Sequence, residues 1–173
     1  KEIQRVRPGE VIVLKDGKIN KSILVKLPTR KKQKKVLDDN FIFKNLKECV
    51  ETHLRSDVPY CLFYSGGIDS TLIMYFMHIL NLNKKICAYS VNFENTDKTS
   101  CELTKNLAKQ FNIELNQIKF TEEDFWNILP FAAKKIDEPI ADYAILPTFK
   151  MASEASKNFK VALSGEGGDE LFA

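Results

Sequence analysis

The chain has 173 residues, of which 44% are hydrophobic and 28% are charged. These proportions suit one globular domain of ordinary size with a real apolar core. The net charge of +3 is too small to argue for a nucleic-acid partner, and no apolar run is long enough to place the chain in a membrane.

The first 27 residues predict a β-hairpin. An apolar run at residues 11–14 is followed by the turn Asp16-Gly17 and by a second strand that reaches Leu27. Because an isolated hairpin is only marginally stable, we expect it to belong to a larger sheet. Residues 28–39 contain Pro28 and a lysine-rich cluster, and they predict a solvated linker rather than an RNA-binding segment. The main domain is therefore expected to span residues 40–173.

From residue 40 onward, helical and strand patterns alternate. Apolar positions at helical spacing predict helices near 41–54, 69–81, 99–111, 121–135 and 146–157, and apolar runs predict strands at 60–64, 86–93, 113–120 and 160–163. Thr121 is the expected N-cap of the fourth helix, and Pro130 is expected to kink or divide that helix. The alternation predicts an α/β fold, an open parallel sheet with helices on both faces.

A glycine-rich loop, residues 65–70 (SGGIDS), lies between the first of these strands and a helix. Its glycines allow a tight turn and the close approach of a ligand. The free N–H groups and the positive end of the following helix favour an anion. We therefore expect phosphate or pyrophosphate here, with Asp69 available to bind Mg²⁺.

A second loop, residues 164–170 (SGEGGDE), repeats this design after the last predicted strand. If the two strands are neighbours, both loops border one crevice at the carboxyl edge of the sheet. Asp69 and Asp169 can then share one Mg²⁺ ion. Neither loop carries the Gly-Lys-Ser/Thr of a Walker A motif. The alternative for each loop alone is an ordinary turn with a helix N-cap.

The motifs resemble those of a known family. Residues 65–70 resemble the pyrophosphate loop of the ATP pyrophosphatases, and residues 164–172 (SGEGGDELF) are similar to the second signature of glutamine-hydrolysing asparagine synthetases. Residues 137–142 (DEPIAD) and 55–59 also resemble segments of that family, and residues 1–27 resemble the closing hairpin of its glutaminase domain. The resemblance implies an adenine nucleotide alpha-hydrolase-like sheet.

The resemblance also implies a reaction. The family activates the side-chain carboxylate of aspartate with ATP, which yields an aspartyl-adenylate and pyrophosphate. Ammonia from glutamine, supplied by an amino-terminal glutaminase domain, then displaces AMP. The work of such a site is mainly the positioning of reactants and the neutralisation of charge.

The same resemblance implies which residues bind each part of the substrate. The pyrophosphate is assigned to Ser65, Gly66, Gly67, Asp69 and Ser70, the adenosine to Phe63 and Val91, further nucleotide contacts to Ser164 and Gly165, and Mg²⁺ to Asp69 and Asp169. Glu166 matches the acid/base carboxylate that deprotonates the attacking ammonium, a role that we expect a buried site to support. The alternative for Glu166 is an exposed turn residue.

The chain departs from the family pattern at Lys1, because the family's glutaminase begins with a cysteine. We therefore expect the middle part of a longer enzyme, which alone binds ATP–Mg²⁺ weakly and makes little or no asparagine. A related synthetase that adenylates another carboxylate, of the β-lactam-forming or peptide-cyclising type, stays open, as do a nucleotide-binding module without full activity and a homodimer. The cysteines lack metal-ligand spacing and predict free thiols in a cytoplasmic protein.

Overall fold

The computed structural model describes residues 5–25, 38–81, 85–94, 98–137 and 142–172. The chain divides into two compact units, residues 1–38 and 39–173, and each is described by itself. Most of the predicted linker, residues 28–37, lies outside the described residues. Among the helices of the described segments, none combines the length and apolar character needed to cross a bilayer.

The first unit is the predicted hairpin. Strands β1 (Glu10–Lys15) and β2 (Lys18–Leu24) pair in antiparallel fashion. Asp16 and Gly17 have φ angles of 53° and 72°, which is the left-handed backbone that a two-residue hairpin turn requires. The hairpin is confirmed, and its second strand ends at Leu24; residues 26 and 27 lie outside the described residues.

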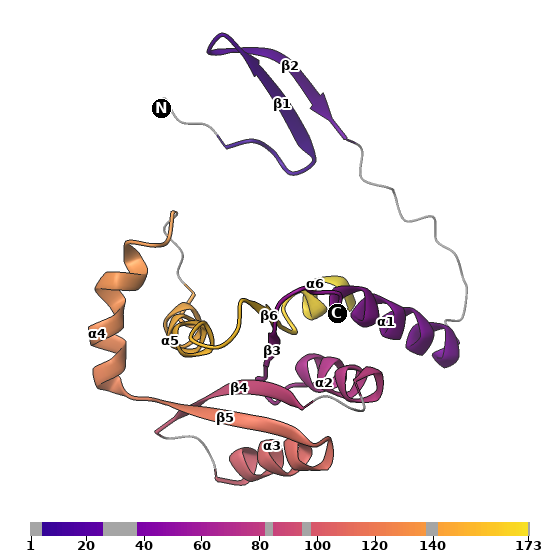
Figure 1. Ribbon diagram of the computed structural model, residues 1–173. Helices are drawn as coiled ribbons and strands as arrows, with labels where there is room; N and C mark the ends of the chain where they lie inside the picture. The colour runs from indigo at the N-terminus through magenta and orange to yellow at the C-terminus, as the bar shows by residue number, and fades with distance from the viewer. Residues whose placement is uncertain (1–4, 26–37, 82–84, 95–97, 138–141, 173) are drawn as a thin grey trace. The chain divides into compact units, whose positions relative to one another are not determined.

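The second unit begins with two helices that enclose a short strand: α1 (Asp39–His53), β3 (Tyr60–Phe63) and α2 (Ile68–Leu80). The chain then continues through β4 (Ile86–Phe93), α3 (Lys98–Gln110), β5 (Ile113–Phe120), α4 (Glu122–Ala133), α5 (Ile145–Ala155), β6 (Val161–Leu163) and α6 (Gly168–Phe172), so that strand and helix alternate except where α5 follows α4. The predicted elements are all present, with ends that differ by one or two residues (Figure 1).

The strands of this unit form one parallel sheet in the order β5-β4-β3-β6. The order reverses after β3, because the chain first builds outward to β4 and β5 and then returns to place β6 on the other side of β3. A ligand site is expected beside such a reversal, at the carboxyl ends of the strands. Helices cover both faces, which confirms the predicted fold class.

Alternate residues of the strands supply two cores. One face carries Leu62 and Ala88, which cluster with Met74 and Met77 of α2 and with Ala108 of α3. The opposite face carries two buried side chains that pack against α5; these are Cys61 and Tyr89. Successive side chains of each strand thus face opposite sides of the sheet, and each side packs against its own layer of helices. The loops lie at the edge of the sheet, between the two layers.

Helix α4 continues the chain beyond β5 and packs beside α5 (Figure 1). Thr121 is its N-cap, as predicted, and forms a capping box with Asp124. The sequence predicts that Pro130 kinks or divides this helix; Pro130 lies inside α4 and the helix runs on to Ala133, so it does not divide the helix. Because Pro130 lies in the last turn, the backbone hydrogen bond that it removes costs the helix little of its length.

Candidate functional site

The two glycine loops meet, as the sequence predicts. β3 pairs with β6 so that Leu62 lies opposite Leu163, and each strand ends where a glycine loop begins. A Cβ atom added to Gly165 would lie 2.9 Å from the backbone nitrogen of Ser70, and one added to Gly168 would lie 2.7 Å from Cγ of Asp69. Only glycine leaves room for this approach. The second loop therefore touches the first loop directly at Asp69 and Ser70.

Hydrogen bonds within residues 65–71 fix the shape of the first loop. Ser65 Oγ accepts from the backbone N–H of Gly67 at 3.3 Å and lies 3.0 Å from Ser70 Oγ. The carbonyl oxygen of Gly67 accepts from the hydroxyl of Ser70 at 3.3 Å and from that of Thr71 at 2.7 Å. Ser70 is only 2% exposed. The loop is thus closed on itself around Gly67.

The first loop also has the features of an anion site. Gly66 has a φ of +83°, a conformation that a side chain would strain. Gly67 is the N-cap of α2, and no side chain caps the helix there. The N–H groups and positive dipole at this helix end are therefore directed to the space beyond the loop, where a phosphate group fits.

A cavity of about 630 Å³ lies beside the two loops. Its lining includes most of the predicted site residues: Phe63, Ser65, Asp69, Ser70, Val91, Ser164, Gly165, Glu166 and Asp169. Gly66 and Gly67 belong to the first loop but do not line the cavity. The strand ends give the cavity an apolar side at Phe63 and Val91, and the loops give it a polar side. This division suits a ligand with a flat apolar part and a charged part.

The carboxylates of the cavity differ in their exposure. Asp69 is half-buried, whereas Asp169, Glu170 and Glu166 are exposed. The expected burial of Glu166 is therefore wrong. Glu166 lines the cavity and is open to solvent among the described residues.

A magnesium ion fits the donor set without requiring a large cluster. Within the described residues, no group of three or more His, Cys, Asp or Glu side chains is arranged to hold a metal. Asp69 and Asp169 nevertheless line the same cavity. Mg²⁺ in nucleotide sites is typically held by one or two carboxylates, with phosphate oxygens and water as its other ligands. Two carboxylates beside an anion site match that pattern.

Helix α5 supplies a wall of the cavity that the sequence analysis did not identify. Pro147, Thr148 and Met151 line the cavity, together with Ala144 just before the helix. Their spacing of three and four residues places them on one helix face. This spacing was visible in the sequence, but it is equally typical of a helix that packs on the sheet. Gly168, which contacts Asp69, was also not singled out.

The segment 137–142, which resembles a substrate-side region, is described only at its ends. Residues 138–141 lie outside the described residues. Asp142 Oδ1 accepts from the backbone N–H of Ala144 at 2.8 Å, which is the hydrogen bond of an ordinary turn before a helix. Asp142 therefore has the hydrogen bond of an ordinary turn residue in this structure.

Comparison with known proteins identifies relatives along nearly the whole chain. The sequence model of the family described as "Asparagine synthase" matches residues 42–173. "Asparagine synthetase [glutamine-hydrolyzing] 1" of Bacillus subtilis is 33% identical over 174 residues, which cover 98% of this chain and 27% of that protein. A "Putative asparagine synthetase [glutamine-hydrolyzing] 2" of Methanocaldococcus jannaschii is 35% identical over 130 residues, which cover 75% of this chain and 25% of the relative.

Solved structures show the same fold at lower sequence identity. Glutamine-dependent NAD⁺ synthetase from Acinetobacter baumannii, solved in complex with ADP, superposes with a TM-score of 0.57 at 17% identity, covering 87% of this chain and 29% of that one. This likeness concerns the fold alone. The chain spans about a quarter of the length of the curated relatives that it matches.

Proposed function

The chain belongs to the asparagine synthase family, and we propose that it forms the ATP site of an enzyme that converts aspartate to asparagine. A side-chain carboxylate oxygen of aspartate attacks the α-phosphorus of ATP, and pyrophosphate leaves as the aspartyl-adenylate forms. Ammonia then attacks the acyl carbon, AMP leaves, and asparagine remains. The observation that carries the proposal is the meeting of the two glycine loops at Asp69.

The first loop binds the pyrophosphate part of ATP. Ser65, Gly66, Gly67, Asp69 and Ser70 surround the uncapped start of α2. Negative charge accumulates on the leaving pyrophosphate during adenylation, and the helix N–H groups are already oriented toward it. Such preorganised donors stabilise the transition state more than the ground state.

The adenosine part lies on the apolar side of the cavity. Phe63 and Val91 line this side at the ends of β3 and β4. Ser164 and Gly165 contact the nucleotide from the second loop, since both line the same cavity. The nucleotide thus extends from the strand ends to the start of α2.

Asp69 and Asp169 hold the Mg²⁺ ion that accompanies ATP. When bound, the ion neutralises charge on the phosphate oxygens of the substrate. Asp69 is positioned for this role by the close approach of Gly165 and Gly168, whereas Asp169 lies in the first turn of α6. The two carboxylates therefore come from different loops, so that metal binding depends on the contact between them.

Glu166 accepts the proton that the attacking ammonium must lose. It lines the cavity from the second loop. In the proposed step, the carboxylate takes one proton from ammonium, and the nitrogen lone pair becomes free to attack the acyl carbon of the adenylate. The bond to AMP then breaks, and the second excess proton on nitrogen leaves with AMP, which gives the neutral amide. A general base must reach the proton that it removes, and the rim position of Glu166 leaves it accessible to ammonia that enters the cavity.

The complete enzyme extends beyond this chain in the proposal. We infer that ammonia comes from glutamine through an amino-terminal glutaminase domain, of which the hairpin at residues 1–27 is the closing part. Residues 28–39 then link that domain to a synthetase domain that begins at residue 40. The names of the curated relatives, which specify glutamine hydrolysis, support this reading.

The first experiment measures ATP binding to the chain by titration calorimetry. We expect weak, saturable binding that requires Mg²⁺, and a loss of at least about tenfold in affinity for Asp69→Asn, since a charge-assisted ligand is removed. Asp57→Asn is the matched control, because Asp57 is exposed and does not line the cavity. Equal affinity of Asp69→Asn and the unaltered chain would contradict the metal assignment.

The second experiment identifies the carboxylate substrate. ATP–pyrophosphate exchange is measured on the full-length protein with a panel of carboxylic acids. Exchange that depends on aspartate supports the proposal. Exchange with another acid favours a related adenylating synthetase, and ATP binding without exchange for any acid favours a nucleotide-binding module that has lost the reaction.

A further inference from the structure

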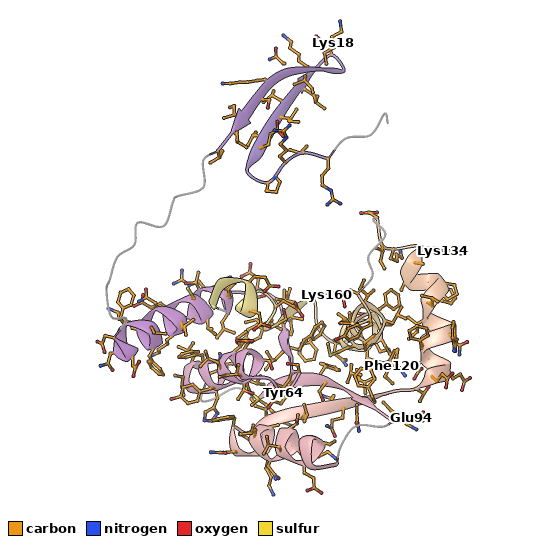
Figure 2. The ribbon with its side chains drawn as sticks, turned by 180° about the vertical axis from the view of Figure 1, so that it is seen from behind. Lys18, Tyr64, Glu94, Phe120, Lys134 and Lys160 are labelled. Atoms are coloured by element: carbon orange, nitrogen blue, oxygen red, sulfur yellow. The ribbon has the colours of Figure 1, made fainter. Side chains whose placement is uncertain are left out.

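Tyr64 connects the interior of the sheet to the first glycine loop. It follows β3 directly, is 1% exposed, and belongs to the core cluster with Leu62 and Met74. Figure 2 labels Tyr64 within the second unit. Its backbone N–H donates to the carbonyl oxygen of Tyr89 at 2.8 Å, so the residue continues the pairing of β3 with β4. A buried phenol in this place needs a partner for its hydroxyl group.

That partner is Thr71, in the first turn of α2. Thr71 Oγ1 lies 3.4 Å from the Tyr64 hydroxyl oxygen and 2.7 Å from the carbonyl oxygen of Gly67. A threonine hydroxyl has one proton, and that proton bonds more strongly to the carbonyl oxygen, because the carbonyl is the nearer acceptor. Thr71 is the donor in both contacts, so its hydroxyl group joins the Tyr64 oxygen in the core to the Gly67 carbonyl oxygen in the loop, with the shorter bond to the carbonyl.

These hydrogen bonds end at Gly67, the residue that shapes the anion site. Gly67 is the N-cap of α2, and its carbonyl oxygen also accepts from the backbone N–H of Thr71 at 3.0 Å. The orientation of this peptide group determines where the next N–H groups point. A rotation of the Gly67 carbonyl would turn the N–H of Ile68 away from a bound phosphate.

We propose that Tyr64 and Thr71 are positioning residues, whose hydroxyl groups hold the Gly67 peptide so that the first loop is ready for pyrophosphate. This inference rests on the proposed function and extends it, because neither residue belongs to the loop motif or to the site residues assigned above. The hydroxyl chain crosses from the core to the ligand surface. In this way it couples the packing of β3 to the geometry of the anion site.

The test compares variants that remove single hydroxyl groups. Tyr64→Phe and Thr71→Val remove the two hydroxyl groups, the acceptor and the donor of this bond, with little change of shape, and Thr71→Ser keeps the donor. Tyr60→Phe is the matched control: Tyr60 lies at the other end of β3, and its hydroxyl donates to Asn81 Oδ1 at 3.0 Å, away from the loop. Each variant is assayed in the full chain for Mg²⁺–pyrophosphate affinity and for thermal unfolding.

We expect Thr71→Val to weaken pyrophosphate binding roughly tenfold and Tyr64→Phe roughly threefold to tenfold, the range for one lost hydrogen bond. Thr71→Ser should restore binding to within about twofold, and Tyr60→Phe should lower thermal stability without changing affinity. The double variant Tyr64→Phe/Thr71→Val should bind no more weakly than Thr71→Val, because both act through one chain. An equal loss in Tyr60→Phe, or no rescue by serine, would overturn the proposal.

Hydrogen exchange of the backbone amides separates this inference from the proposed function. If the unaltered chain binds no pyrophosphate, the proposed function fails, but the hydroxyl chain is still tested. Faster exchange at residues 67–71 in Tyr64→Phe and Thr71→Val, with no change in Tyr60→Phe, supports the positioning role. Unchanged exchange in both loop variants refutes it.

Discussion

The first glycine loop is held by hydrogen bonds, whereas the second is held by close packing. In residues 65–71, hydroxyl groups and the Gly67 carbonyl bond to one another. In residues 164–168, the structure gives one long backbone bond, from the Gly168 N–H to the Gly165 carbonyl at 3.4 Å, and two glycines pressed against Asp69. The loops share a sequence pattern, but the second takes its shape from the first.

This difference predicts the largest effect at Gly165. A Cβ atom there would lie 2.9 Å from a backbone nitrogen that cannot move without disturbing α2. We expect Gly165→Ala to lower the free energy of unfolding by about 1–3 kcal/mol, the usual cost of overpacking, and to weaken ATP–Mg²⁺ binding more than tenfold by pushing the loops apart. Chemical denaturation and titration calorimetry measure the two effects.

Gly167→Ala is the control for Gly165→Ala. Gly167 has a φ of +93°, but an added Cβ atom meets nothing within 4 Å. The cost is then backbone strain alone, of about 1 kcal/mol, with little loss of binding. If Gly167→Ala weakened binding as much as Gly165→Ala, flexibility of the second loop would matter more than its contact with the first.

Gly168→Ala sharpens the comparison by acting on a side chain rather than on backbone. The added Cβ atom would lie 2.7 Å from Asp69 Cγ and 2.8 Å from Oδ1. Since the carboxylate can rotate away, we expect a stability loss below about 1 kcal/mol but a clear loss of Mg²⁺-dependent ATP binding. In an Asp69→Ala background, calorimetry should show no further loss from Gly168→Ala. An additive loss would show that Gly168 acts elsewhere.

The sequence predicted the parts of this site better than their environment. Strand, Ser-Gly turn and aspartate follow from local chemistry, and the meeting of the loops follows from strand order, so both could be anticipated. The exposure of Glu166 could not be anticipated from the sequence, because it depends on which residues cover the loop in three dimensions. The cavity wall at Thr148 and Met151 was missed for a related reason: an apolar helix stripe looks the same whether it faces a sheet or a ligand.

Helix α5, which lines the cavity, is joined to α4 by an ion pair. We expect this ion pair to have a smaller, pH-dependent effect on the free energy of unfolding. Lys150 Nζ lies 2.6 Å from Asp124 Oδ2, and the two side chains are 24% and 26% exposed. The hydrogen bond from Lys150, aided by the backbone N–H of Thr121, lowers the pKa of Asp124. A lowered carboxyl pKa contributes stability above the unfolded pKa of about 3.9, which is lost as the pH falls through the folded pKa.

Asp124→Asn should therefore destabilise the second unit by about 1 kcal/mol near neutral pH, the scale of a helix cap or a partly exposed ion pair. The difference from the unaltered chain should narrow as the pH falls below about 4, where the aspartate of the unfolded chain becomes protonated, and further as the pH passes the lowered pKa of the folded state. Denaturation at several pH values measures this. Glu123→Gln, at an exposed position in the same helix turn, should show no comparable pH dependence; a constant penalty for Asp124→Asn would show that charge is not the cause.

The smallest expected change in stability comes from removing single buried hydroxyl groups. It tests whether burial or hydrogen bonding holds the shape of the first loop. Ser70 and Ser90 are 2% and 4% exposed, but Ser70 bonds within the loop, whereas Ser90 Oγ has no hydrogen-bond partner among the described residues. Removing a bonded buried hydroxyl costs about 1 kcal/mol, whereas removing an unpaired one relieves a desolvation penalty. We therefore expect Ser70→Ala to be destabilising and Ser90→Ala to be neutral or stabilising by up to about 1 kcal/mol in denaturant titrations. Equal losses in both variants would mean that packing around the hydroxyl groups, and not their hydrogen bonds, sets the stability of this region.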